Sequence, residues 1–177
     1  IMAVGVGIGG LGVFAALFHV FNHSICKALS FCCAGRIGQM YGTHDMHKIR
    51  GVLGASPALG TGLICGILVL IGVAPFAIFM SEFIILKAAV ESAQYWTVTA
   101  FLVGAVLVFI GALRHAISMA WKSAEEGELP EAAGKYSISD AVMVAAPLAV
   151  LLMLGLWMPQ PFVHFIIRAA VILGGLS

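Results

Sequence analysis

The sequence predicts an all-α integral membrane protein, and two observations support that fold class. Of the 177 residues, 62% are hydrophobic and 10% are charged, and the mean hydropathy is +1.09. A soluble domain of this size is far more polar. The apolar residues also form runs of about 20 residues or more, the length that a helix needs to cross a hydrocarbon core about 30 Å thick.

Four such runs follow one another along the chain, at about residues 11–41, 56–91, 96–121 and 139–158. Residues 1–8 look like the end of an earlier helix that is closed by Gly9 and Gly10. The sequence opens with Ile1 in the middle of this pattern and has no basic region typical of a signal peptide. We therefore expect either processing or a piece of a longer polypeptide.

The second run predicts a broken helix over about residues 57–91. It is too long for one straight span, and Pro75 lies in its middle, where a proline removes one N–H and clashes with the preceding turn. We expect a first half over 57–73 and a second half over 78–91. Unwound backbone at membrane depth is tolerated only where protein or a water-filled cavity satisfies it, so residues 74–79 should face the interior.

The sequence divides into a transmembrane helical domain over residues 1–158 and a C-terminal segment over residues 159–177. Pro159 and Pro161 end the fourth run. The apolar stretch that follows is too short to span a bilayer, and it places His164 and Arg168 four residues apart on one helix face. These features predict an interfacial amphipathic helix.

Basic residues predict the orientation of the spans. Lys48 and Arg50 lie between the first two runs, with Arg36 and Arg114 near the same side, and Lys122 and Lys135 lie between the last two. The opposite side carries Lys87 and Arg168. We therefore expect loops 42–55 and 122–138 in the cytoplasm and the C-terminus outside. The acidic group Glu125, Glu126, Glu128 and Glu131 indicates a solvated loop rather than a binding site.

Composition also excludes several functions. A net charge of +1 and a pI of about 7.9 leave no field that would attract nucleic acid. We expect no metal or cofactor in this chain and no catalytic residue, because no nucleophile with a paired base, phosphate loop or metal-ligand spacing is present. The four cysteines lie in apolar runs without C-x-x-C spacing, and we interpret them as core residues: Cys26, Cys32, Cys33 and Cys65.

A row of titratable residues on the first run is the strongest functional feature. His19, His23 and Lys27 are spaced four apart, with Asn22 and Ser24 beside them. Four residues advance a helix by about 6 Å and little more than one turn, so the row is polar along one face. Such a row can hold water and pass a proton. The alternative is that one histidine bonds a neighbouring helix and the lysine extends to the surface.

Glu82, preceded by Ser81 just beyond the predicted break, is the second candidate for an ion pathway. Free backbone groups and water near a break can stabilise either protonation state of a carboxyl group. The alternative is a permanently protonated acid in a hydrogen bond between helices. A weaker candidate is Lys87, which can instead pair with Glu91 at the interface. The adjacent Arg114 and His115 are also weaker candidates, which either continue an exit path or anchor their helix.

Two long segments resemble a known family of membrane proteins. They resemble the last third of the antiporter-like subunits of complex I, Mrp-type antiporters and energy-converting hydrogenases. The two segments are LFHVFNHSICKALSFCCAGRI and PALGTGLICGILVLIGVAPFAIFMSEFIILKA. The motifs NHS…K…AG and PF…SEF are most similar to group 4 membrane-bound NiFe hydrogenases of the formate hydrogenlyase type. The resemblance implies the C-terminal part of a subunit of about fourteen helices with one discontinuous helix in this part.

The resemblance also implies function and partners. His19, His23 and Lys27 would belong to a central hydrophilic axis, and Glu82 would end the channel. The expected function is translocation of protons or sodium ions in a redox-driven membrane complex of a prokaryotic cytoplasmic membrane. NiFe and iron–sulfur centres would lie in partner subunits, and another chain or segment would supply the missing N-terminal helices. The alternatives are a subunit of a stand-alone Mrp-type cation/proton antiporter and a structural membrane anchor.

Overall fold

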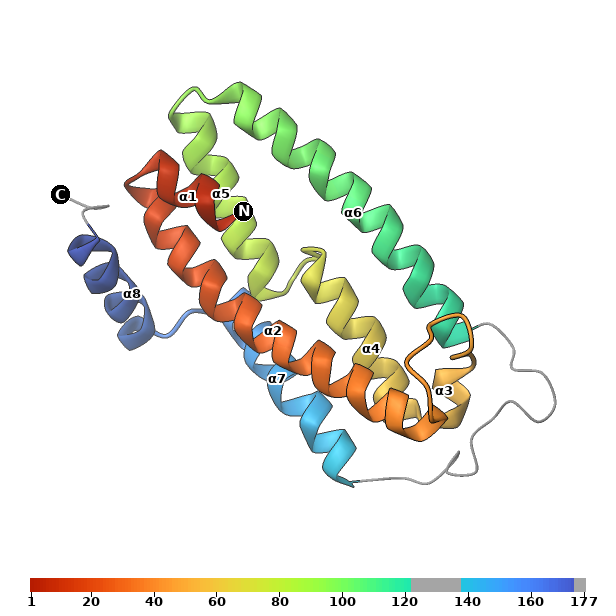
Figure 1. Cartoon of the computed structure of the whole chain (residues 1–177). Helices are drawn as coiled ribbons and strands as arrows, with labels where there is room; N and C mark the ends of the chain where they lie inside the picture. The colour runs from red at the N-terminus through yellow and green to blue at the C-terminus, as the bar shows by residue number, and fades with distance from the viewer. Residues whose placement is uncertain (122–137, 174–177) are drawn as a thin grey trace.

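The computed structural model describes residues 1–121 and 138–173, and every regular element within these ranges is a helix (Figure 1). In chain order the helices are α1 (Met2–Ile8), α2 (Leu11–Tyr41), α3 (Val52–Ala55), α4 (Pro57–Leu70), α5 (Ala77–Glu91), α6 (Tyr95–Trp121), α7 (Ile138–Leu156) and α8 (Gln160–Ile172). Within the described ranges, α2, α6 and α7 are long and apolar enough to cross a membrane. The predicted all-α membrane fold is confirmed.

Helices α4 and α5 lie roughly end to end and form the broken helix (Figure 1). At the start of α4 the Ser56 hydroxyl accepts a hydrogen bond from the Leu59 amide at 3.5 Å, and Pro57 fits the first turn because it lacks an N–H. The helix ends at Leu70, since Gly72 adopts a φ of +76°, a conformation that favours glycine.

The break therefore spans residues 71–76, three residues earlier than the predicted 74–79. The expected end at 73 was wrong, because Gly72 stops α4 before Pro75 can, whereas the expected start at about 78 lies one residue from the observed Ala77. The break packs on α7: a Cβ at Gly155 would collide with the Pro75 carbonyl oxygen and the Phe76 backbone. Ala74 and Pro75 are themselves exposed, so the expectation that residues 74–79 face the interior is wrong for these two and holds for Ala77 and Ile78, which are buried.

Helix α2 lies at the centre of the bundle and packs against α1, α4, α5, α7 and α8. Its buried residues Phe14, Phe18 and Cys26 share one core with Val69 of α4, Ile78 of α5, Leu151 of α7 and Ile166 of α8. Helix α6 instead runs along the outside, next to α4 and α5 (Figure 1). Its buried residues in the described structure are Ala116 and Ala120, and most of its other side chains are exposed.

Helix α8 packs on α2 through its aromatic and small side chains. The Phe162 ring lies 6.1 Å from the Phe18 ring and 4.9 Å from the Phe21 ring, between centroids. Ile166 is buried, while His164 and Arg168 are exposed. The exposed residues of α8 also include Phe165 and Ile172, so an amphipathic helix at the membrane interface over residues 159–177 stays a prediction.

The segment at 42–55, expected as a loop, contains the short helix α3 (Val52–Ala55). The Tyr41 hydroxyl fixes this segment by donating a hydrogen bond to the Arg50 carbonyl at 2.6 Å. Residues 122–137 of the other predicted loop, which include Lys122, Lys135 and the four acids, lie outside the described residues.

Candidate functional site

The polar row on α2 places two imidazoles against each other inside the bundle. His19 is 2% exposed and His23 is half-buried. Their rings are stacked, with centroids 5.5 Å apart and planes inclined by 23°. Lys27 follows one turn later, and its ammonium lies 5.5 Å from the centroid of the Phe31 ring. The structure thus brings the two histidines together and leaves Lys27 beside an aromatic face.

A hydrogen bond joins this row to the second half of the broken helix. His19 Nδ1 lies 2.9 Å from Ser81 Oγ, and both side chains are buried. The Ser81 hydroxyl donates its single proton to the Ile78 carbonyl at 2.7 Å. It must therefore accept the hydrogen bond from His19, so Nδ1 carries a proton and Nε2 is the nitrogen that can take up or release another.

Asn22 forms a second connection between the same two helices. Its amide nitrogen donates to the Ala77 carbonyl at 3.3 Å, in the first turn of α5. The side chain is fully buried, and its Oδ1 has no hydrogen-bond partner among the described residues. A buried acceptor left unpaired costs about 1–3 kcal/mol, and an internal water is the usual remedy. We therefore expect an internal water at Asn22 Oδ1.

Glu82 faces away from this row and toward the break. A Cβ added at Gly72 would collide with the Glu82 carboxylate, so the acid lies directly on the left-handed turn that ends α4. No hydrogen bond or salt bridge joins Glu82 to any residue in the described ranges. Unlike the histidines, the acid has no direct protein partner there.

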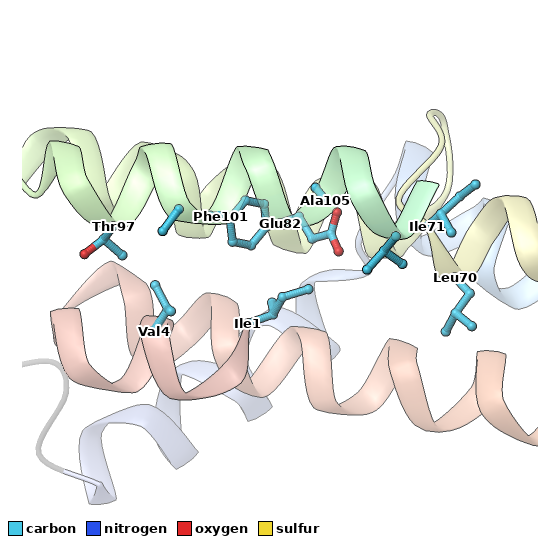
Figure 2. A pocket seen from close by; sticks show the side chains of 11 residues that line it. Ile1, Val4, Leu70, Ile71, Glu82, Thr97, Phe101 and Ala105 are labelled. Atoms are coloured by element: carbon cyan, nitrogen blue, oxygen red, sulfur yellow. The ribbon is translucent and has the colours of Figure 1, made fainter. Parts of the chain in front are cut away.

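The carboxylate of Glu82 opens into a cavity of about 530 Å³ (Figure 2). The cavity is lined by Leu70 and Ile71 at the end of α4, by Val4 of α1, and by Thr97, Phe101 and Ala105 of α6. Since one water takes up about 30 Å³ in the liquid, the cavity can hold a hydrated ion or a chain of waters. The acid is therefore placed to exchange a proton or bind a cation from the α6 side.

Adjacent positions on α5 thus carry the two halves of the site on different faces. Successive residues of a helix point about 100° apart, so Ser81 faces α2 while Glu82 faces the cavity. The sequence grouped the α2 row and Glu82 on one axis. The structure places them on two sides of the same helix, with α5 between them.

The weaker candidates lie outside this centre. Lys87 Nζ is 3.8 Å from Glu91 Oε1, and both side chains are more than half exposed, which is typical of a surface pair. Ser24 is exposed and donates to the Val20 carbonyl of its own helix. Arg114 and His115 are exposed on α6 and line a separate cavity.

Sequence reasoning missed Asp140. Its carboxylate accepts two hydrogen bonds from Arg36, from Nε at 2.9 Å and from Nη2 at 3.2 Å. The pair joins the end of α2 to the start of α7, with the Asp140 side chain 10% exposed. The sequence feature that could have indicated this pair is Asp140 itself, the single acidic residue at the start of the last apolar run. Arg36 entered the sequence analysis only as a basic residue that indicates the orientation of the spans.

The cysteines show no shared site. Cys26 and Cys33 are buried, Cys65 is half-buried and Cys32 is exposed, so the interpretation of all four as core residues is wrong for Cys32. Cys26 Sγ donates to the Gly66 carbonyl at 3.4 Å and so contacts α4. Within the described part of the chain, no three histidine, cysteine or acidic residues are grouped as a metal site would need.

Comparison with known proteins places this geometry in a family context. A family model described as "NADH:quinone oxidoreductase/Mrp antiporter, TM" matches residues 1–108. A hydrogenase-4 component F homolog of Methylacidiphilum infernorum is 39% identical over 90 residues, which are 50% of this chain and 19% of that protein. A Na(+)/H(+) antiporter subunit of Alkalihalophilus pseudofirmus is 24% identical over 96% of this chain and 35% of its own length.

Among solved structures, the fold matches a chain of the Mrp complex from Dietzia sp. DQ12-45-1b with a TM-score of 0.67 and 19% identity. The match covers 97% of this chain and 38% of the other. The chain therefore spans between 19% and 38% of the length of these relatives.

Proposed function

Because the chain belongs to the NADH:quinone oxidoreductase/Mrp antiporter transmembrane family, we propose that it is the ion-translocating C-terminal part of a multi-pass membrane subunit. The observation that carries the proposal is the His19–Ser81 hydrogen bond at 2.9 Å. It connects a pair of titratable imidazoles with the helix that carries Glu82 and follows the break. Ionisable groups at bilayer depth cost several kcal/mol, so a connected set of them needs a functional reason.

The stacked histidines suit transfer of one proton at a time. Two positive charges 5.5 Å apart repel each other by about 3 kcal/mol at an effective dielectric constant of about 20. A proton that arrives at one imidazole therefore favours departure of a proton from the other. Lys27, one turn further along α2, adds a third basic group to the same row.

Helix α5 couples this row to Glu82. Its first turn is held by Asn22 through the Ala77 carbonyl and by His19 through Ser81. A change in charge at the histidines alters these contacts, and a small shift of α5 then moves the Glu82 carboxylate relative to Gly72 and the cavity. In this mechanism a change in protonation at the histidines on one face of α5 changes the position of the Glu82 carboxylate on its other face.

We propose a redox-driven complex as the setting, with a stand-alone antiporter as the second candidate. The 39% identity to a hydrogenase-4 component F homolog supports the first. The longer match to the Alkalihalophilus antiporter protein supports the second. In the first, nickel–iron and iron–sulfur centres belong to partner subunits; in both, other membrane subunits and the preceding helices complete the assembly in a prokaryotic cytoplasmic membrane.

The proposal is tested in inside-out membrane vesicles that contain the complete complex, with a fluorescent dye that reports the pH gradient. Glu82→Gln removes the titratable carboxyl with little change in shape, and translocation should fall at least tenfold while the complex still assembles. Glu91→Gln is the matched control, because this acid is exposed on the same helix. Normal translocation in Glu82→Gln would favour a structural membrane anchor instead.

The source of energy for translocation distinguishes a redox-driven complex from a stand-alone antiporter. A redox-driven complex acidifies the vesicles when an electron donor for the partner subunits is added without sodium. A stand-alone antiporter instead dissipates a preformed pH gradient when sodium is added, and its purified complex contains no redox module.

A further inference from the structure

A second cavity, of about 440 Å³, lies where the last third of α6 meets the segment between α2 and α3. Its polar wall consists of His47 from that segment and of Arg114, His115 and Ser118 from α6. Its apolar wall includes Ile110 and Met119. Figure 1 shows this segment crossing close to the end of α6, away from the break between α4 and α5.

The nitrogen-bearing side chains of this cavity have no protein partner in the described ranges. The Arg114 guanidinium and the His115 and His47 imidazoles are exposed, and none makes a hydrogen bond or an ion pair there. No described lining residue is acidic. The nearby Asp45 carboxylate instead accepts the His47 backbone amide at 3.0 Å. A guanidinium with its donors free beside two imidazoles is a strong arrangement for binding the oxygens of a phosphate.

The apolar wall continues along the outer face of α6. Leu107, Ile110 and Val103 are all at least half exposed, and they extend from the cavity toward the middle of the helix. A cationic cavity at one end of an exposed apolar helix face matches a phospholipid, whose headgroup is charged and whose acyl chains are not. Free phosphate would use the cationic wall but would have no need of the apolar one.

We infer that this cavity binds the phosphate of an anionic phospholipid, held by Arg114, His115 and His47, with the acyl chains along α6. Lys48 and Arg50 on the same segment add positive charge at this end of the molecule, which attracts an anionic leaflet. The inference is independent of ion translocation through His19 and Glu82. It assigns to Arg114 and His115 a role at the membrane surface rather than in an exit path.

The test uses the complete complex in nanodiscs and a phosphatidylglycerol that carries a photoreactive acyl chain. After illumination, mass spectrometry of α6 peptides measures labelling. Arg114→Gln should weaken binding about fivefold, the effect expected from one basic residue near an anionic surface, and the double variant with His115→Gln should weaken it further. Arg168→Gln, which removes an exposed guanidinium from α8, should leave labelling of α6 unchanged.

A steric variant keeps the test decisive if charge removal disturbs folding. Gly111 lines the cavity, and a Cβ there meets no atom within 4 Å, so Gly111→Leu fills the cavity and leaves every charge in place. It should abolish labelling near this position. Gly35→Leu on α2, where a Cβ also meets no atom within 4 Å and which lines neither cavity, is the control.

Two further arms identify the ligand. Photoreactive phosphatidylcholine should label this site much less than phosphatidylglycerol, and inorganic phosphate should compete poorly. Equal labelling by both lipids, or unchanged labelling in Arg114→Gln and Gly111→Leu, would overturn the inference. Displacement by inorganic phosphate as effective as by unlabelled phosphatidylglycerol would show a free-anion site and would also overturn it.

Discussion

His19 Nδ1 lies 2.9 Å from Ser81 Oγ, and the same hydroxyl donates to the Ile78 carbonyl at 2.7 Å. This short chain runs from the centre of α2 to the first turns of α5. It fixes which nitrogen of His19 carries the permanent proton. It also makes the position of α5 sensitive to the charge of a histidine on another helix, which is the relationship that the proposed ion translocation requires.

Replacing Ser81 by alanine removes the acceptor for His19 without changing any charge. A hydrogen bond of about 1 kcal/mol net corresponds to a factor of about five, so we expect translocation in vesicles to slow at least about fivefold. Ser24→Ala is the matched control, because Ser24 is exposed and its hydroxyl bonds the backbone of its own helix. Equal rates in the two variants would contradict a role for the His19–Ser81 contact.

Gly72→Ala tests the contact between the break and Glu82. The substitution forces a side chain into a left-handed conformation, which costs about 1–2 kcal/mol, and its Cβ would collide with the Glu82 carboxylate. We expect loss of translocation together with a modest fall in thermal stability. Gly35→Ala places a methyl group in open space on α2 and should affect neither. Full activity of Gly72→Ala would show that the pose of the acid is unimportant.

Asn22 predicts an ordered water. Its buried Oδ1 has no partner among the described residues, and an unpaired acceptor of this kind is usually satisfied by internal water. A high-resolution electron cryomicroscopy map of the complete complex should show density within hydrogen-bonding distance of Oδ1, beside His19 and His23. Dry, close packing of apolar atoms around this oxygen would remove the water from the proposed pathway.

The Arg36–Asp140 pair should stabilise the docking of α7 on α2. Hydrogen bonds to charged groups contribute about 1.5–3 kcal/mol, and partial exposure of Arg36 lowers this, so a double-mutant cycle should give a coupling energy of about 1–2 kcal/mol. The cycle uses Arg36→Gln and Asp140→Asn and is measured by thermal unfolding of the complex. The exposed pair Lys87–Glu91 should give about 0.3–0.5 kcal/mol. Similar values for both pairs would exclude a special role for Asp140.

The membrane spans could be predicted from sequence because length and hydropathy determine them. The predicted run at 11–41 coincides with α2, and Pro75 correctly indicated a broken helix. The end of α4 was misplaced because it depends on the left-handed conformation of Gly72, three residues before the proline. A proline in a sequence indicates that a helix is interrupted nearby. A single glycine does not indicate by itself that a helix ends there.

The sequence indicated which residues belong to the candidate site, but it did not indicate how they are placed relative to one another. The spacing of His19 and His23 placed them on one face of a helix whatever the tertiary structure. The separation of Ser81 from Glu82 onto two faces of α5 depends on which helices pack on each side. The pairing of Arg36 with Asp140, 104 residues away, depends in the same way on packing between distant helices, which the pattern of either helix alone does not contain.

The most direct test of a single pathway through α5 compares proton flux in vesicles for His19→Gln, Glu82→Gln and the double variant. If the two groups act in series, the double variant should be no slower than the slower single variant, because either substitution already interrupts the path. Losses that multiply in the double variant would instead show that His19 and Glu82 act independently, and would contradict the coupling across α5 on which this account is based.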